Sequence, residues 1–229
     1  MELSAAPINP PDFSRSRAEL EALGIPPDLP REAVDYARKE AIKCTGNDVL
    51  AMKGFLEYGL PMRFLRDELK PRGWKTGRKQ NLEMVVSPDY SFAIISAAGN
   101  ESTGIPDEMP CTRTEKGPRT EDRVKETQLA LELPGLREPR HLAPRPGAMQ
   151  SWFLLYFRDA GKREIRIELS RGVGFTVLNS KTGHGIVSDF APRLYIEPIL
   201  LEAQAETTSS KKLEHEHEHI DIDVTRRSG

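Results

Sequence analysis

The sequence predicts an α+β protein: an N-terminal helical block leads into a β-hairpin and then, after a proline-rich crossing, into an antiparallel meander. Between residues 30 and 69 apolar residues recur every three or four positions, which is typical of amphipathic helices. From Leu82 they alternate every second position, which is typical of strands. The 229 residues, 38% of them hydrophobic, suffice for one large or two small domains. We expect one continuous sheet with helices on one side.

The first elements are helical. Residues 1–13 hold three prolines among small and polar residues, and this composition predicts a mobile arm. Ser16 and Glu19 form a capping-box pattern that predicts a short helix ending at Leu23. A longer helix is expected from about Pro30 to Cys44, because one face then carries Val34, Ala37, Ala41 and Cys44.

Two more helices are expected before the first strand. Asn47 caps the third, which runs to Gly59 and directs inward Val49, Met52, Phe55 and Leu56. Pro61 opens the fourth, because proline is favoured in a first helical turn. Pro71 and Gly73 end the block. The short connections predict antiparallel neighbours.

A hairpin is predicted next, with strands at residues 82–86 and 91–97 and a Ser-Pro-Asp-Tyr turn between them. Residues 99–118 lack a periodic apolar pattern and are expected to form a long loop. Thr120 caps a helix that places on one side Val124, Thr127 and Leu131. Prolines and glycines then gather in residues 134–149, which predicts a linker.

The strongest strand signal is the continuous apolar run Trp152–Phe157, which predicts a central strand covered on both faces. Residues 163–170 alternate strictly, so Ile165, Ile167 and Leu169 should face the core and Glu164, Arg166 and Glu168 the solvent. A further strand is expected at residues 193–201. The predicted organisation is therefore an arm, a helical part with a hairpin and loop, a linker, a meander and an acidic tail, over residues 1–13, 14–133, 134–149, 150–201 and 202–229.

Several features bear on the compartment. Two cysteines, Cys44 and Cys111, are too few for the disulfide framework of a small secreted domain. The first residues lack a secretory signal pattern, and no apolar run approaches the ~18 residues that a membrane span needs. We therefore expect a cytoplasmic protein with no membrane partner.

The formal net charge of -2 argues against a uniform basic coat but conceals a basic block. The segment from Arg63 to Lys79 contains seven cations and two carboxylates, a net charge of +5, and Trp74 lies near its centre. Cations can contact phosphates and an aromatic ring can stack on a base, so the block predicts a nucleic-acid contact. Its residues are Arg63, Arg66, Lys70, Arg72, Trp74, Lys75, Arg78 and Lys79. The alternative is a solvated helix end with Trp74 packed in the core.

An acidic block of net charge -5 lies between Glu202 and Asp223. If its Glu-His repeat is extended, one face carries three imidazoles, from His215, His217 and His219, which can bind a divalent metal such as zinc or nickel. The alternatives are a solvated tail, an affinity-tag-like segment and a strand edge protected by charge. Ile220–Val224 alternate with aspartates, which predicts a terminal strand able to add to a sheet edge or a protein partner.

The signals for catalysis are weak. Ser209 and Lys212 match one box of a serine acylase, but the companion Lys-Thr-Gly box precedes them, which is the wrong order. The loop at residues 99–118 follows a hairpin strand, where binding and catalytic groups often lie. If the protein is an enzyme, the candidate residues are Asn100 and Glu101.

The chain contains five motifs: Val-Val-Ser-Pro-Asp, Ala-Ile-Ile-Ser-Ala-Ala-Gly-Asn-Glu-Ser-Thr-Gly, Ser-Trp-Phe-Leu-Leu-Tyr, Glu-Ile-Arg-Ile-Glu-Leu-Ser and Arg-Leu-Tyr-Ile-Glu-Pro-Ile. With these motifs it resembles, over about residues 30–201, a group of uncharacterised bacterial proteins often carried on prophages, plasmids and integrative elements. The resemblance implies a mobile-element accessory or defence-related role, with no activity or catalytic residues attached.

Together these observations favour a non-catalytic binding or regulatory protein that contacts nucleic acid or a nucleoprotein partner through the basic block. The alternative is a small hydrolase or nuclease-like enzyme, metal-dependent or not, with a site in the loop at residues 99–118. No cofactor is expected apart from the divalent metal considered above.

Overall fold

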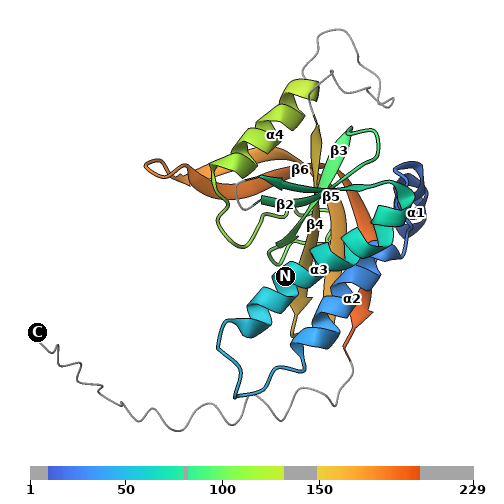
Figure 1. Ribbon diagram of the computed structural model, residues 1–229, viewed down its shortest axis with the longest axis vertical. Coiled ribbons are helices and arrows are strands. Elements are labelled where there is room, and N and C mark those ends of the chain that lie inside the picture. The colour runs from blue at the N-terminus through green and yellow to red at the C-terminus, as the bar shows by residue number, and fades with distance from the viewer. Residues whose placement is uncertain (1–9, 80–81, 132–148, 202–229) are drawn as a thin grey trace, which may run out of the picture.

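The computed structural model describes residues 10–79, 82–131 and 149–201, and Figure 1 shows their arrangement. The fold is α+β, as predicted, with helices preceding most of the strands. The helical elements are α1 (Phe13–Ala22), α2 (Leu29–Ala41), α3 (Met52–Leu69), the 3-10 turn η1 (Lys70–Arg72) and α4 (Pro118–Leu131). The strands are β1 (Lys75–Lys79), β2 (Leu82–Val86), β3 (Phe92–Ala98), β4 (Gln150–Asp159), β5 (Glu164–Asn179) and β6 (His184–Leu200).

The strands form one six-stranded sheet in sequence order, β1 to β6. Neighbours are antiparallel except β3 and β4, which are parallel, with Phe92 beside Gln150 and Ala98 beside Tyr156. Parallel neighbours need a long crossover, and the segment that contains α4 provides it. The predicted single sheet and its hairpin at β2 and β3 are confirmed.

Helices cover both faces of the sheet, so the expectation of helices on one side was wrong. α1, α2 and α3 pack on one face, where Trp152 and Leu154 join their apolar cluster. α4 packs on the other face, where Val124 meets Phe153 and Leu155. In Figure 1, α2 and α3 lie side by side across the sheet and α4 stands apart from them. The apolar run of β4 needs two covers because its successive side chains alternate between the faces.

The first helix begins earlier than the capping-box pattern predicts. Asp12 is the N-cap of α1, and its side chain accepts a hydrogen bond from the Arg15 backbone N–H. Ser16 lies inside the helix and is buried. Its hydroxyl accepts a hydrogen bond of 2.9 Å from the backbone N–H of Tyr195 in β6. The serine therefore joins the first helix to the last strand.

α3 is one helix where the sequence predicts two, and it contains Pro61 in its interior. Val49 and Phe55, which were expected to face the core, are each 66% exposed. Proline has no N–H, so the Glu57 carbonyl four residues earlier loses its helical donor. The Tyr156 hydroxyl of β4 donates to that carbonyl at 2.9 Å. Burial raises the pKa of Tyr156, which keeps the hydroxyl protonated as a donor.

We therefore expect Tyr156→Phe to lower the free energy of unfolding by about 1–3 kcal/mol, because the Glu57 carbonyl loses its remaining donor. In a Pro61→Ala background the loss should be smaller, since the new backbone N–H can bond to the same carbonyl. Urea unfolding of the parent, the two single variants and the double variant measures the coupling. An equal cost in both backgrounds would contradict the pairing.

Two strands are much longer than predicted, and a third was not predicted. β5 continues beyond its predicted end through residues 172–174, and β6 begins before its predicted start and includes residues 184–190. Glycines interrupt the apolar pattern in both segments. A Cβ at Gly172 would lie 2.6 Å from the Phe153 ring, so glycine is required there by close packing. β1 was not predicted because its sequence, Lys-Thr-Gly-Arg-Lys, has no apolar residue. β1 is the edge strand of the sheet, and a charged edge strand resists pairing with the edge of another sheet.

The arm to residue 9, residues 134–148 of the predicted linker and the acidic tail lie outside the described residues.

Candidate functional site

The predicted basic block runs from the end of α3 through η1 into β1. Gly73, at φ 86, ends η1 in a left-handed conformation and turns the chain into the sheet. Trp74 is only 4% exposed and packs edge-on against Phe92, with ring centroids 5.3 Å apart. The prediction that Trp74 stacks on a base is therefore wrong, because the core already covers the ring.

Two of the arginines hold the structure together. Arg66 donates to the Glu83 carboxylate at 2.6 Å and to the carbonyls of Gly77 and Met84 at 3.2 Å. Arg78 pairs with the same carboxylate. The hydrogen bond from Arg66 is the main cause that lowers the pKa of Glu83. Arg66 therefore attaches the edge hairpin of β1 and β2 to α3, and Arg78 joins the two strands of that hairpin.

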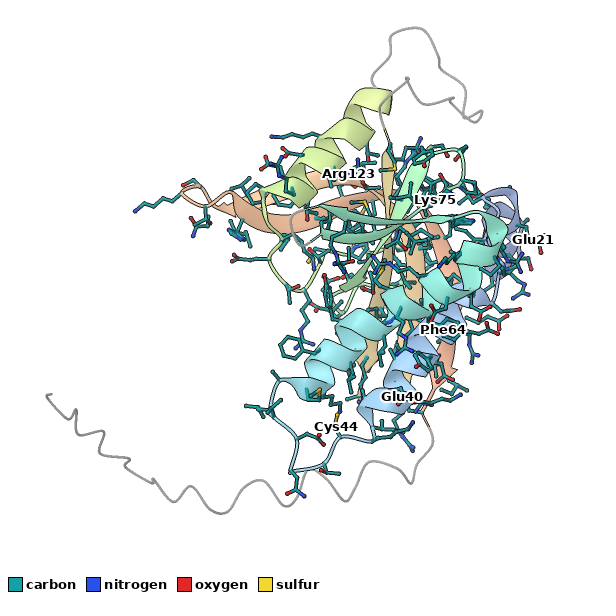
Figure 2. All side chains as sticks on the ribbon, viewed as in Figure 1. Glu21, Glu40, Cys44, Phe64, Lys75 and Arg123 are labelled. Carbon is teal, nitrogen blue, oxygen red and sulfur yellow. The ribbon has the colours of Figure 1, made fainter. Side chains whose placement is uncertain are left out.

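The other cations are more accessible. Lys70, Arg72 and Lys75 are exposed, and none of the three has an ion pair with the residues that the structure describes. Arg63 faces Asp67 at 3.7 Å, but both side chains are 68% exposed and such pairs are weak. Figure 2 places Lys75 near the edge of the sheet. The side chain of Lys79 is outside the description.

The loop predicted at residues 99–118 is held by its own backbone and by Asn100. The Asn100 side-chain oxygen accepts from the Cys111 backbone N–H at 3.0 Å, and the Asn100 backbone N–H donates to the Cys111 carbonyl. Glu101 is exposed, and its carbonyl accepts from Arg166 at 2.6 Å. The pKa of the Cys111 thiol is raised, mainly by burial and secondarily by the charge of Glu101. A nucleophilic cysteine needs a lowered pKa, so this environment does not activate the thiol. These contacts are structural ones, and the catalytic role stays a prediction.

A buried ion pair, which the sequence does not reveal, anchors this loop to the sheet. Glu168 is fully buried, although its place in the β5 alternation predicts solvent exposure, because the loop covers this part of the second face. Its carboxylate accepts from Nε and Nη2 of Arg193 and from the Gly104 N–H at 2.9 Å. Arg193 also donates to the Glu108 carbonyl at 2.6 Å. The only indication of this contact in the sequence is the length of the loop at residues 99–118, since so long a loop must pack against part of the protein.

The metal prediction on His215, His217 and His219 falls outside the described residues. Within residues 10–79, 82–131 and 149–201, no three His, Cys, Asp or Glu side chains gather closely enough to hold a metal ion. None of the described helices combines the length and apolar character of a membrane span.

We compared the chain with protein-family models, curated proteins and solved structures, and none of them matches it.

Proposed function

We propose that this chain is a non-catalytic binding protein whose partner is a nucleic acid or nucleoprotein, contacted through Lys70, Arg72 and Lys75. The observation that carries the proposal is that these cations are exposed and, among the described residues, have no carboxylate partner. They come from η1 and the start of β1, which Gly73 joins by a tight turn. Short sequence distance and a tight turn keep the three charges on one part of the surface.

The burial of Trp74 bears on the mode of binding that we propose. With Trp74 unable to stack on a base, we expect the affinity to come from phosphate contacts, which release counterions and carry no base information. We therefore propose binding that is independent of sequence and steeply dependent on salt. The mobile-element or defence setting rests on the resemblance alone, and the enzyme alternative stays a prediction without a contact that favours it.

The test is the salt dependence of binding to a fluorescently labelled oligonucleotide, single-stranded and duplex, with the full chain. Lys70→Gln with Lys75→Gln should reduce the slope of log K against log salt by about 1.4–1.8, since each lost phosphate contact contributes about 0.7–0.9. Both lysines are exposed, so the fold should persist.

The matched control is Lys162→Gln with Lys181→Gln, which removes two exposed lysines from turns elsewhere in the chain. This variant should retain the slope of the parent. Absent binding, binding insensitive to salt, or an equal loss in the control would each overturn the proposal.

A further inference from the structure

A cavity of about 290 Å³ opens between the α2–α3 hairpin and the carboxyl ends of β3 and β4. Four cations line it, each from a different segment: Arg38 of α2, Lys53 of α3, Arg113 of the loop after β3 and Arg158 of β4. Among the described residues of the lining, Glu57 is the single carboxylate. These cations lie far apart in the sequence and outside the basic block, so only the fold brings them together.

The parallel pairing of β3 and β4 explains the convergence. Both strands end at the same edge of the sheet, and the Gly99 N–H donates to the Tyr156 carbonyl at 2.9 Å. The Arg113 N–H donates to the Ala98 carbonyl at 2.8 Å, which returns the loop to this edge. Crevices outside the carboxyl ends of parallel strands are frequent ligand sites.

The charges in the lining are not all neutralised. Lys53 and Arg113 are exposed, and neither has an ion pair with a residue that the structure describes. Arg38 lies 2.9 Å from Asp35, a carboxylate that it shares with Lys39. An anion in the cleft would therefore meet two cations that are available without breaking an existing pair.

The remaining lining is apolar. Val34, Ala37 and Ile165 are buried members of it. The Tyr156 hydroxyl is already bonded to the Glu57 carbonyl, so this ring adds mainly apolar surface. Exposed cations beside an apolar lining suit a ligand with an anionic end and an apolar body. The volume is near the lower limit of about 300 Å³ for small-molecule pockets, which suits a small ligand.

We propose that this cleft binds a phosphate monoester, with the phosphate between Lys53 and Arg113 and the organic group against Val34, Ala37 and Ile165. A doubly charged phosphate matches the excess of cations better than a single carboxylate, and guanidinium groups bind phosphate oxygens in pairs. A small metabolite and the terminal phosphate of a nucleic-acid strand share this chemistry. The site is independent of Lys70, Arg72 and Lys75.

The experiment is calorimetric titration of the full chain with phenyl phosphate, inorganic phosphate and benzyl alcohol. Phenyl phosphate should bind, and each of the other two, which lacks one half of the ligand, should bind at least tenfold more weakly. Lys53→Gln with Arg113→Gln should weaken phenyl phosphate by tenfold or more, because charge-assisted contacts are lost. The double variant Lys162→Gln with Lys181→Gln should bind as the parent does.

Three results would overturn the proposal: no binding of phenyl phosphate, inorganic phosphate binding equally well, or equal weakening in the control variant. A second titration identifies the source of the phosphate. If a 5′-phosphorylated oligonucleotide binds more tightly than its 5′-hydroxyl form, and Lys53→Gln with Arg113→Gln removes that difference, the ligand is a strand end. If the two forms bind equally while phenyl phosphate binds in the cleft, the ligand is a small ester.

Discussion

Replacing Arg193 with methionine should lower the free energy of unfolding by about 3–5 kcal/mol. The substitution leaves the fully buried Glu168 carboxylate without its cation, and an unpaired buried charge is costly. It also removes the donor to the Glu108 carbonyl, so the loop loses an anchor. Urea unfolding measures the first effect, and hydrogen exchange at Gly104, whose N–H bonds to Glu168, measures the second.

Arg171→Met is the matched control, since Arg171 lies on β5, next to β6, and donates to the Ala191 carbonyl at 2.8 Å. That change should cost about 1 kcal/mol, the value of an ordinary hydrogen bond. Glu168→Leu combined with Arg193→Met should recover most of the loss, because no charge is then buried alone. A cost for Arg193→Met no larger than that of Arg171→Met would show that the pair does not anchor the loop.

Phe153→Ala should destabilise the protein by about 3–5 kcal/mol. The ring is fully buried, lies edge-on to Phe190 with centroids 5.8 Å apart, and fills the space above Gly172. Removing it opens a cavity between α4 and the sheet that the surrounding strands can only partly close.

The variant Gly172→Ala tests the same contact from the other side. Its Cβ would lie 2.6 Å from Phe153, so in the parent the change should cost about 1–3 kcal/mol. In the Phe153→Ala background the ring is gone and the cost should fall, although Val187 at 3.2 Å keeps the site narrow. If Gly172→Ala costs the same in both backgrounds, the ring does not set the need for glycine.

The sequence predicted the elements whose environment is simple. β4 reads as a continuous apolar run because both its faces are buried, and β2 and β3 read as a hairpin because their turn is local. α4 was found because Val124 and Thr127 lie on its buried side. In each case the pattern along the chain reports the packing directly.

The failures occurred where distant segments determine the environment. Glu168 alternates like a surface residue but is covered by a loop some 64 residues earlier in the chain. Pro61 predicts a helix start, yet α3 continues through it. The Tyr156 hydroxyl of β4 donates to the Glu57 carbonyl, which has no helical donor because Pro61 lacks an N–H. The cleft cations come from α2, α3, the loop after β3 and β4, and the parallel pairing that brings the last two together is one that no local pattern indicates.

The basic block shows the limit of charge counting. The net charge of the linear segment omits Glu83, which comes from β2 and pairs with two of its arginines. It also treats Trp74 as available, whereas the core holds it. The predicted surface is thereby reduced to the cations at the turn around Gly73.

The bond between Ser16 and Tyr195 spans 179 residues, and it has a consequence for synthesis of the chain. A ribosome releases α1 long before β6, so the helix must wait until the last strand emerges to find its packing surface. Contacts between residues so far apart slow folding, because a long stretch of chain must first be ordered. We therefore expect the apolar side of α1 to remain exposed until β6 emerges, in the period when chaperones bind nascent chains.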